Sequence, residues 1–227
     1  MSRASSPRDK VREDLEQLTA ELIGLGLVDD QNFPATKQVG NGLWEVSFKG
    51  AENICLAMVD SDYDLIYKEL FESRSFSLKL IDGGLLQLSY RFEGDVLLKH
   101  RLAYYPSPSL RPFQEDPELY MREELYMEIV SRRVVPFPLR FDYDLKAAKD
   151  MAHPSCHLTL GDIEGCRIPV HSPLMPRQFL EFIVRNFYQT EKFDFISGFP
   201  KHRYFFDASI TVNEKNLIHL AVPSNLL

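Results

Sequence analysis

Residues 76–105 constrain the fold more than any other part of the chain. Apolar and polar residues alternate there with a period of two, which is typical of strands whose two faces meet different surroundings. Two glycine-containing turns, at 82–84 and 93–95, divide the stretch into three segments. Turns of this kind join neighbouring antiparallel strands. The sequence therefore predicts a three-stranded antiparallel meander with one apolar face.

The apolar face of this meander is expected to form the centre of the core. Its members, spread over all three segments, are Phe76, Leu78, Leu80, Leu86, Leu88, Tyr90, Phe92, Leu98, Leu102 and Tyr104. In the middle segment, Gln87, Ser89 and Arg91 are expected to point outward. His100 falls on the apolar face, so we expect a core histidine whose polar atoms are satisfied.

Four helices are expected beside the sheet, over 6–24, 60–74, 117–132 and 176–188. Ser6 is a suitable cap for the first helix, and Pro7 suits its first position. The apolar stripe of that helix contains Val11, Leu15, Leu18, Leu22 and Ile23. For the second helix, Asp60 or Ser61 is the expected cap, and for the third Asp116.

Further strands are expected over 44–48 and 137–143, in a hairpin over 155–171, and in a pair over 209–212 and 217–222. The strands cluster in antiparallel runs, with helices between the clusters. This arrangement indicates an α+β fold rather than alternating βαβ units. We expect one domain over residues 1–227, in which residues 1–30 form an N-terminal helical segment.

Composition excludes several classes of protein. Hydrophobic residues make up 44% of the 227, and the net charge is −7, so binding of duplex DNA would require a local basic patch. No apolar run reaches the roughly 18 residues of a membrane span. The three cysteines, Cys55, Cys156 and Cys166, form no CxxC pair, which argues against a disulfide framework or a cysteine-rich zinc site. We expect a cytoplasmic protein without membrane contact and, since no phosphate-binding glycine loop occurs, without a cofactor.

The hairpin over 155–171 contains the candidate site. Gly161 and Gly165 bracket its turn, which pairs Leu158 with Ile168 and His157 with Pro169. A slip of one residue would exchange the two faces, and the apolar set decides which face is inside. The polar face then contains His157, Thr159, Arg167, Pro169 and His171.

These residues suit acid–base chemistry on a phosphodiester without a metal. Of the two imidazoles of His157 and His171, the neutral one would accept the proton of the attacking hydroxyl. The charged one would donate a proton to the leaving oxygen. Arg167 would stabilise the developing charge, while Arg140 and Asp142 of the preceding strand would orient the histidines. The alternative is that these are ordinary surface residues on a solvated strand face.

Two other groups of residues are candidate binding sites. His153 and His157 are four residues apart, about 13 Å in an extended strand, which is too far to share a metal ion without a sharp bend. We therefore expect no metal site. Lys201, His202 and Arg203 precede the aromatic run 204–206, which is consistent with a solvated loop or with a platform for single-stranded nucleic acid.

The stretch 136–188 is similar to a known family. The motifs are Arg140-Phe-Asp-Tyr-Asp, His153-Pro-x-x-His-Leu-Thr-Leu-Gly, Cys166-Arg-Ile-Pro-Val and Phe182-Ile-x-Arg-Asn-Phe-Tyr. They resemble an uncharacterised bacterial family catalogued as a domain of unknown function, and their spacing resembles small proteins of toxin–antitoxin loci. The resemblance implies a bacterial cytoplasmic protein from a mobile or defence locus. It directs attention to His153, His157, Cys166, Arg167, Arg185 and Asn186.

Two functions remain as hypotheses. The first is a non-enzymatic component of a toxin–antitoxin or phage-defence module, which binds a protein partner encoded nearby. The acidic charge and the aromatic residues near the tail favour it. The second is a metal-independent endoribonuclease that uses His157, His171 and Arg167, with RNA or another single-stranded nucleic acid as its partner. A concave pocket around the histidines would favour the enzyme.

Overall fold

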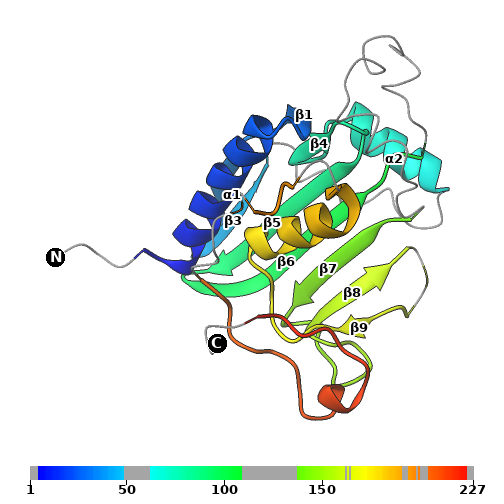
Figure 1. The fold of residues 1–227 in the computed structure, drawn as a ribbon. Coiled ribbons are helices and arrows are strands. Elements are labelled where there is room, and N and C mark those ends of the chain that lie inside the picture. Colours follow the sequence, from blue (N-terminus) through cyan, green and yellow to red (C-terminus); the bar gives the residue numbers. More distant parts are fainter. Residues whose placement is uncertain are drawn as a thin grey trace, which may run out of the picture.

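A nine-stranded antiparallel sheet organises the chain (Figure 1). The computed structural model describes residues 5–48, 62–108, 137–161, 163, 165–190, 194–197, 199 and 204–223. The strands are β1 (Val28–Gln31), β2 (Pro34–Gly40), β3 (Leu43–Phe48), β4 (Leu78–Leu80), β5 (Leu85–Glu93), β6 (Val96–Tyr105), β7 (Leu139–Asp144), β8 (Cys156–Leu160) and β9 (Ile168–Pro169). Their order is β1-β4-β5-β6-β7-β8-β9, with β3 also paired to β5 and β2 to β3. With the helices, this confirms the predicted α+β class.

The meander lies where the sequence predicts it, as β4, β5 and β6. Leu86, Leu88, Tyr90 and Phe92 are all buried. Gln87 was expected outside but is only 1% exposed, and its Nε2 donates to the backbone oxygen of Ser75. The prediction for Gln87 is wrong because the second face of the sheet is covered here. Helix α2 (Tyr63–Glu72) packs on this face. It contributes to a small second core, formed by Tyr67, Leu70, Phe76, Leu85, Ala103 and Tyr105.

A β-bulge shifts the end of the meander. Between Arg91 and Phe92 the pairing with β6 changes register, so Phe92 pairs with Leu97. Leu97 is therefore buried in the core, and Leu98, which the simple alternation placed inside, is half-buried. A bulge inserts one extra residue into a strand and reverses the alternation beyond it.

Helices α1 (Pro7–Gly24) and α6 (Pro176–Ile183) lie across one face of the sheet (Figure 1). Ser6 caps α1, as predicted, by accepting a hydrogen bond from the Asp9 N–H at 3.2 Å. Ile23 does not belong to the buried stripe, since it is 40% exposed. None of the described helices combines the length and apolar character that crossing a bilayer requires.

The predicted helix over 176–188 ends in a wider turn. Residues Val184–Tyr188 form a π-helical turn, η2, directly after α6. The inner side of α6 packs on the sheet through Phe179 and Phe182, whose rings meet Phe141 edge-on at centroid distances of 6.1 and 5.4 Å. Phe141 belongs to the core face of β7, so α6 covers that face.

The second helix starts later than expected. Its cap is Asp62, whose side chain accepts from the Asp64 N–H, whereas Asp60 and Ser61 lie outside the described residues. The expected helix over 117–132 and its cap Asp116 also lie outside the described residues.

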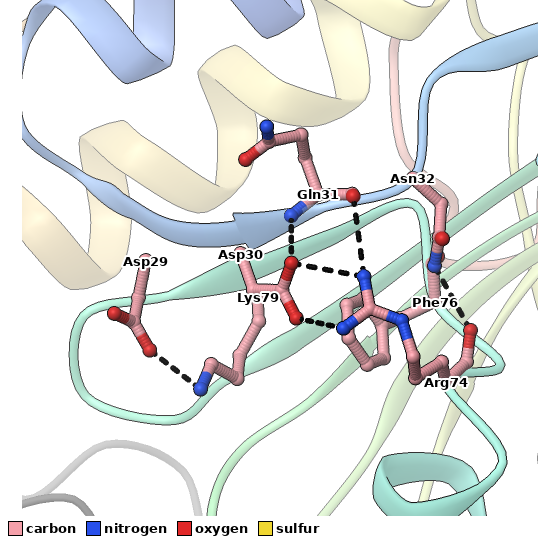
Figure 2. A network of polar contacts seen from close by, with 7 residues as sticks. All are labelled: Asp29, Asp30, Gln31, Asn32, Arg74, Phe76 and Lys79. Carbon is pink, nitrogen blue, oxygen red and sulfur yellow. Dashed lines mark hydrogen bonds and ion pairs between the residues drawn. The ribbon is translucent and has the colours of Figure 1, made fainter.

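The first two strands, β1 and β2, fall between the predicted helix over 6–24 and the predicted strand over 44–48, and neither was predicted. β1 contains two adjacent aspartates and β2 is exposed along most of its length, so neither shows an alternating pattern. Polar contacts hold β1 in place instead (Figure 2). Arg74 pairs with Asp30, Lys79 pairs with Asp29, and Asn32 donates to the backbone oxygen of Arg74 at 2.9 Å.

Over the described residues 204–223, the tail forms no strand pair. Residues 209–212 are irregular, and a short 3-10 helix, η3 (Glu214–Asn216), follows where a turn was expected. Leu220 forms a single parallel bridge with Val170, beside β9. The predicted pair does not form because both segments bond to residues 169–171: Ser209 and Ile210 donate to the His171 carbonyl, and Leu220 bonds to Pro169 and His171. In Figure 1 the tail, coloured orange to red, runs past β8 and β9.

Candidate functional site

Strand register places one polar row across β6, β7 and β8. Arg101 is opposite Asp142, and Asp142 is opposite His157. On the other side, His157 pairs with Pro169 and Leu158 with Ile168, which confirms the predicted register of the hairpin. This row lies on the face of the sheet opposite α1 and α6, because its residues alternate with core residues such as Phe141.

Asp142 is the anionic centre of the row. Its Oδ1 accepts a hydrogen bond from Nε of Arg101 at 3.1 Å, and its Oδ2 lies 3.8 Å from Nε of Arg140. Burial by itself would raise the pKa of Asp142, but the charges of Arg101 and Arg140 outweigh this effect and lower it. Asp142 is therefore an ionised carboxylate at neutral pH, paired mainly with Arg101.

His157 is buried, which corrects the expectation of an open, solvated face. It is 5% exposed, and Thr159 on the same face is 6% exposed. A tight turn, closed by hydrogen bonds between Lys149 and His153, brings the His153 ring against the His157 ring. Burial lowers the pKa of His157, against the opposing effects of the Pro154 carbonyl and Asp142.

This turn also overturns the argument that separated the two histidines. The ring centroids of His153 and His157 are 4.9 Å apart, with an interplanar angle of 76°. The extended strand begins only at Cys156, so the chain bends sharply between the two residues. In the described ranges, however, no group of three or more histidine, cysteine or acidic side chains is placed to hold a metal ion.

The other predicted catalytic residues separate into two positions. Arg167 is exposed just before β9, near enough to His157 for its charge to lower the pKa of that imidazole. His171 follows β9, and its backbone bonds to Leu220 and Ser209 of the tail. His171 shares no hydrogen bond or ring contact with His157 within the described part of the chain.

The residues suggested by the family motifs do not form one site. Arg185 and Asn186 are exposed in η2, where Arg185 pairs with Glu181 at 2.6 Å. They follow α6, which covers the core face and not the polar face. Cys156 and Cys166 are free thiols, the first buried and the second half-exposed. The predicted binding residues Lys201, His202 and Arg203 lie outside the described residues.

A separate cleft, which sequence reasoning missed, opens beside the tail. It encloses about 640 Å³ and lies between the β5–β6 turn, the loop after β7 and the segment 204–214. Its walls include three aromatic side chains, Tyr143, Tyr204 and Phe206. The rings of Tyr204 and Phe206 meet edge-on at 5.5 Å.

The cleft is acidic as well as aromatic. Asp95, Asp150 and Asp207 are exposed on its lining. Among the described residues, Lys149 also lines the cleft, and Nζ of Lys10 lies 4.2 Å from the centroid of the Tyr204 ring. Asp150 accepts hydrogen bonds from the Thr211 hydroxyl and from Nδ2 of Asn213, which fixes the loop after β7 to the tail. The sequence signal that could have found this cleft is the aromatic run 204–206, but its acidic partners come from distant segments.

Comparison with known proteins gives one match. A family model described as "Uncharacterized conserved protein (DUF2290)" matches residues 27–222. No curated protein matches the chain, and no solved structure matches it.

Proposed function

This chain belongs to the DUF2290 family of uncharacterized conserved proteins, and because that membership implies no reaction, we propose from its surface that it is a non-enzymatic, partner-binding component. The observation that supports this function best is the cleft beside the tail, with its aromatic walls and acidic lining. The proposed setting, a bacterial toxin–antitoxin or phage-defence module in the cytoplasm, follows from the sequence resemblance.

The chemistry of the cleft defines the partner. Three exposed carboxylates, Asp95, Asp150 and Asp207, favour lysine or arginine side chains. Lys10 of the chain itself lies over the Tyr204 ring, and the ring of Phe206 favours apolar groups. Val96 and Leu145, which are 60% and 51% exposed, add apolar surface at the opening. The partner is therefore a protein segment that is both basic and apolar.

The second hypothesis, a metal-independent endoribonuclease, has less support. It requires two imidazoles that reach one phosphodiester. The His171 backbone bonds to the tail, and within the described residues no hydrogen bond or ring contact joins its ring to that of His157. RNA cleavage by the purified protein is assayed without added metal. Cleavage that is lost in His157→Ala would favour the enzymatic function over the binding function.

Site-specific photo-crosslinking in the native host tests the binding function. A photoreactive phenylalanine replaces Val96 at the cleft or, as the control, Leu65 on α2; these side chains are 60% and 61% exposed. We expect one protein to be crosslinked from position 96 and not from position 65.

A charge reversal then tests the chemistry of that contact. Asp95→Lys combined with Asp207→Lys should abolish the crosslink from position 96, because the cleft then repels a basic segment. Glu69→Lys, an exposed change on α2, is the matched control and should preserve it. The same protein captured from both positions, or a crosslink that survives reversal of both aspartates, contradicts the proposal.

A further inference from the structure

Guanidinium groups gather on the polar face of β6 to β9, although the chain as a whole has a charge of −7. Arg101 and Arg140 come from β6 and β7, and Arg167 lies just before β9. Asp142 is opposite His157 in the strand register, and Arg167 directly precedes Ile168, the partner of Leu158, so both charged residues lie close to the His157 position. With Asp142 as the anion at their centre, the surroundings of His157 have an excess of positive charge.

Two polar atoms in this group are buried without a hydrogen-bond partner. They are Nε of Arg140 and Nδ1 of His153. Arg140 Nε lies 3.8 Å from Oδ2 of Asp142, beyond hydrogen-bond distance, while Oδ1 of Asp142 is bonded to Arg101. An unsatisfied buried polar group costs about 1–3 kcal/mol, so a ligand with several acceptor oxygens would recover free energy here.

The protonation of His157 fits such a ligand. Its Nδ1 lies 2.9 Å from the backbone oxygen of Pro154, which can only accept a hydrogen bond. The ring therefore has its proton on Nδ1 when neutral, and Nε2 remains able to take a second proton. A bound anion would favour the doubly protonated ring, because it stabilises the positive charge.

We propose that Arg140, Arg167, His153 and His157 form a binding site for a phosphate group. Phosphate offers acceptor oxygens in the arrangement that a guanidinium donates to in pairs, and its negative charge compensates the excess of positive charge around Asp142. The phosphate belongs to a nucleotide or to the backbone of a single-stranded nucleic acid. This site is separate from the cleft and does not depend on the proposed partner.

NMR of the imidazole ring signals of the full chain tests the proposal. Inorganic phosphate, AMP and a short single-stranded RNA are titrated in turn, each as a separate probe. We expect saturable shifts of the His153 and His157 signals, and a higher pKa of His157 in the bound state. Tighter binding of the RNA than of AMP assigns the phosphate to a nucleic-acid backbone, and equal or weaker binding assigns it to a nucleotide.

Two variants test the assigned residues. Arg140→Gln should weaken phosphate binding roughly tenfold or more, since it removes a charged donor. Arg167→Gln, an exposed change that leaves the core untouched, should also weaken it, whereas Arg185→Gln on the opposite face should have no effect. If the two imidazole signals do not move, or if both site variants bind phosphate as the unmodified chain does, the proposal is wrong.

Discussion

The hydroxyl of Tyr188 lies 3.0 and 2.9 Å from the two carboxylate oxygens of Asp82. This contact joins the π-helical turn η2 to the turn between β4 and β5, and both residues are buried. The Tyr104 hydroxyl lies 3.0 Å from the Tyr188 hydroxyl. Because the single proton of Tyr188 is donated to Asp82, Tyr104 is the donor in that second contact. A hydrogen-bonded chain therefore runs from β6 through η2 to the β4–β5 turn.

Removing the Tyr188 hydroxyl should destabilise the fold. In Tyr188→Phe, Asp82 retains the Gly84 N–H as a donor but loses the phenol, and the Tyr104 hydroxyl loses its acceptor. We expect the free energy of unfolding to fall by about 1–3 kcal/mol, measured by urea denaturation. Tyr63→Phe is the control, since its hydroxyl donates to the Pro106 carbonyl from a half-buried position. An equal loss in both variants would argue against a special role for the buried chain.

Asp82 should make the protein less stable as the pH rises. Burial raises the pKa of this carboxyl above its ordinary value of 3.8, against the bonds from Gly84 and Tyr188. The contribution of protonated Asp82 to the free energy of unfolding is therefore complete below pH 3.8 and is lost as the pH rises through the folded-state pKa. Asp82→Asn cannot ionise, so the difference in unfolding free energy between variant and parent should grow in favour of the variant from about pH 4 upward. A difference independent of pH would contradict the raised pKa.

Arg177 should contribute more to stability than the other arginine of its helical segment. It is 5% exposed and bonds to Asp14 at 3.0 Å and Glu21 at 3.2 Å, so it fixes α6 to α1. Arg177→Met leaves both carboxylates without this partner and should lower the free energy of unfolding by about 3 kcal/mol. Arg185→Met breaks an exposed pair with Glu181 and should cost less than about 0.5 kcal/mol. Thermal unfolding of the two variants side by side gives the comparison.

The alternating segments show how far sequence patterns predict this fold. Period-two alternation predicted the meander, β7 and the pairing of His157 with Pro169, because each of these depends on which side of a strand a residue takes. Alternation gives no information on what covers a face. Gln87 and His157 were both expected in solvent, and both are buried under segments that the alternation of their own strands does not reveal.

The candidate sites depended on features that local patterns do not contain. The contact of His153 with His157 follows from a reversal at Lys149–His153, where Met151 has a φ of 60°, an unusual value for a residue other than glycine. The cleft brings together Asp95, Asp150 and Asp207, which are more than fifty residues apart along the chain. Only the tertiary fold makes them neighbours.

His157→Ala should destabilise the protein, contrary to what an exposed polar face would imply. The substitution removes a ring that is 5% exposed, packs on His153 and bonds to Pro154. We expect a loss of about 1–3 kcal/mol in unfolding free energy. Arg167→Ala on the same face is exposed and should change stability by less than about 0.5 kcal/mol. If both variants melt with the unmodified chain, the packing around His157 is looser than the structure indicates.

His100 should have the opposite effect on pH dependence to that of Asp82. Burial lowers its pKa from 6.5 to about 4, against weaker effects such as the charge of Asp142. The neutral ring accepts a hydrogen bond from the Leu174 N–H at Nε2, and Tyr90 and Tyr143 pack against it. The stability due to the neutral ring is therefore complete above the unfolded-state pKa and is lost as the pH falls toward the folded-state value.

His100→Gln isolates this effect, because the amide oxygen is able to accept from Leu174 and does not titrate. As the pH falls through the interval between 6.5 and about 4, the unmodified chain should lose stability relative to the variant. Urea denaturation of His100→Gln and Asp82→Asn over the same pH series should give differences of opposite slope. If both differences change with pH in the same direction, burial does not raise the pKa of Asp82 or does not lower that of His100.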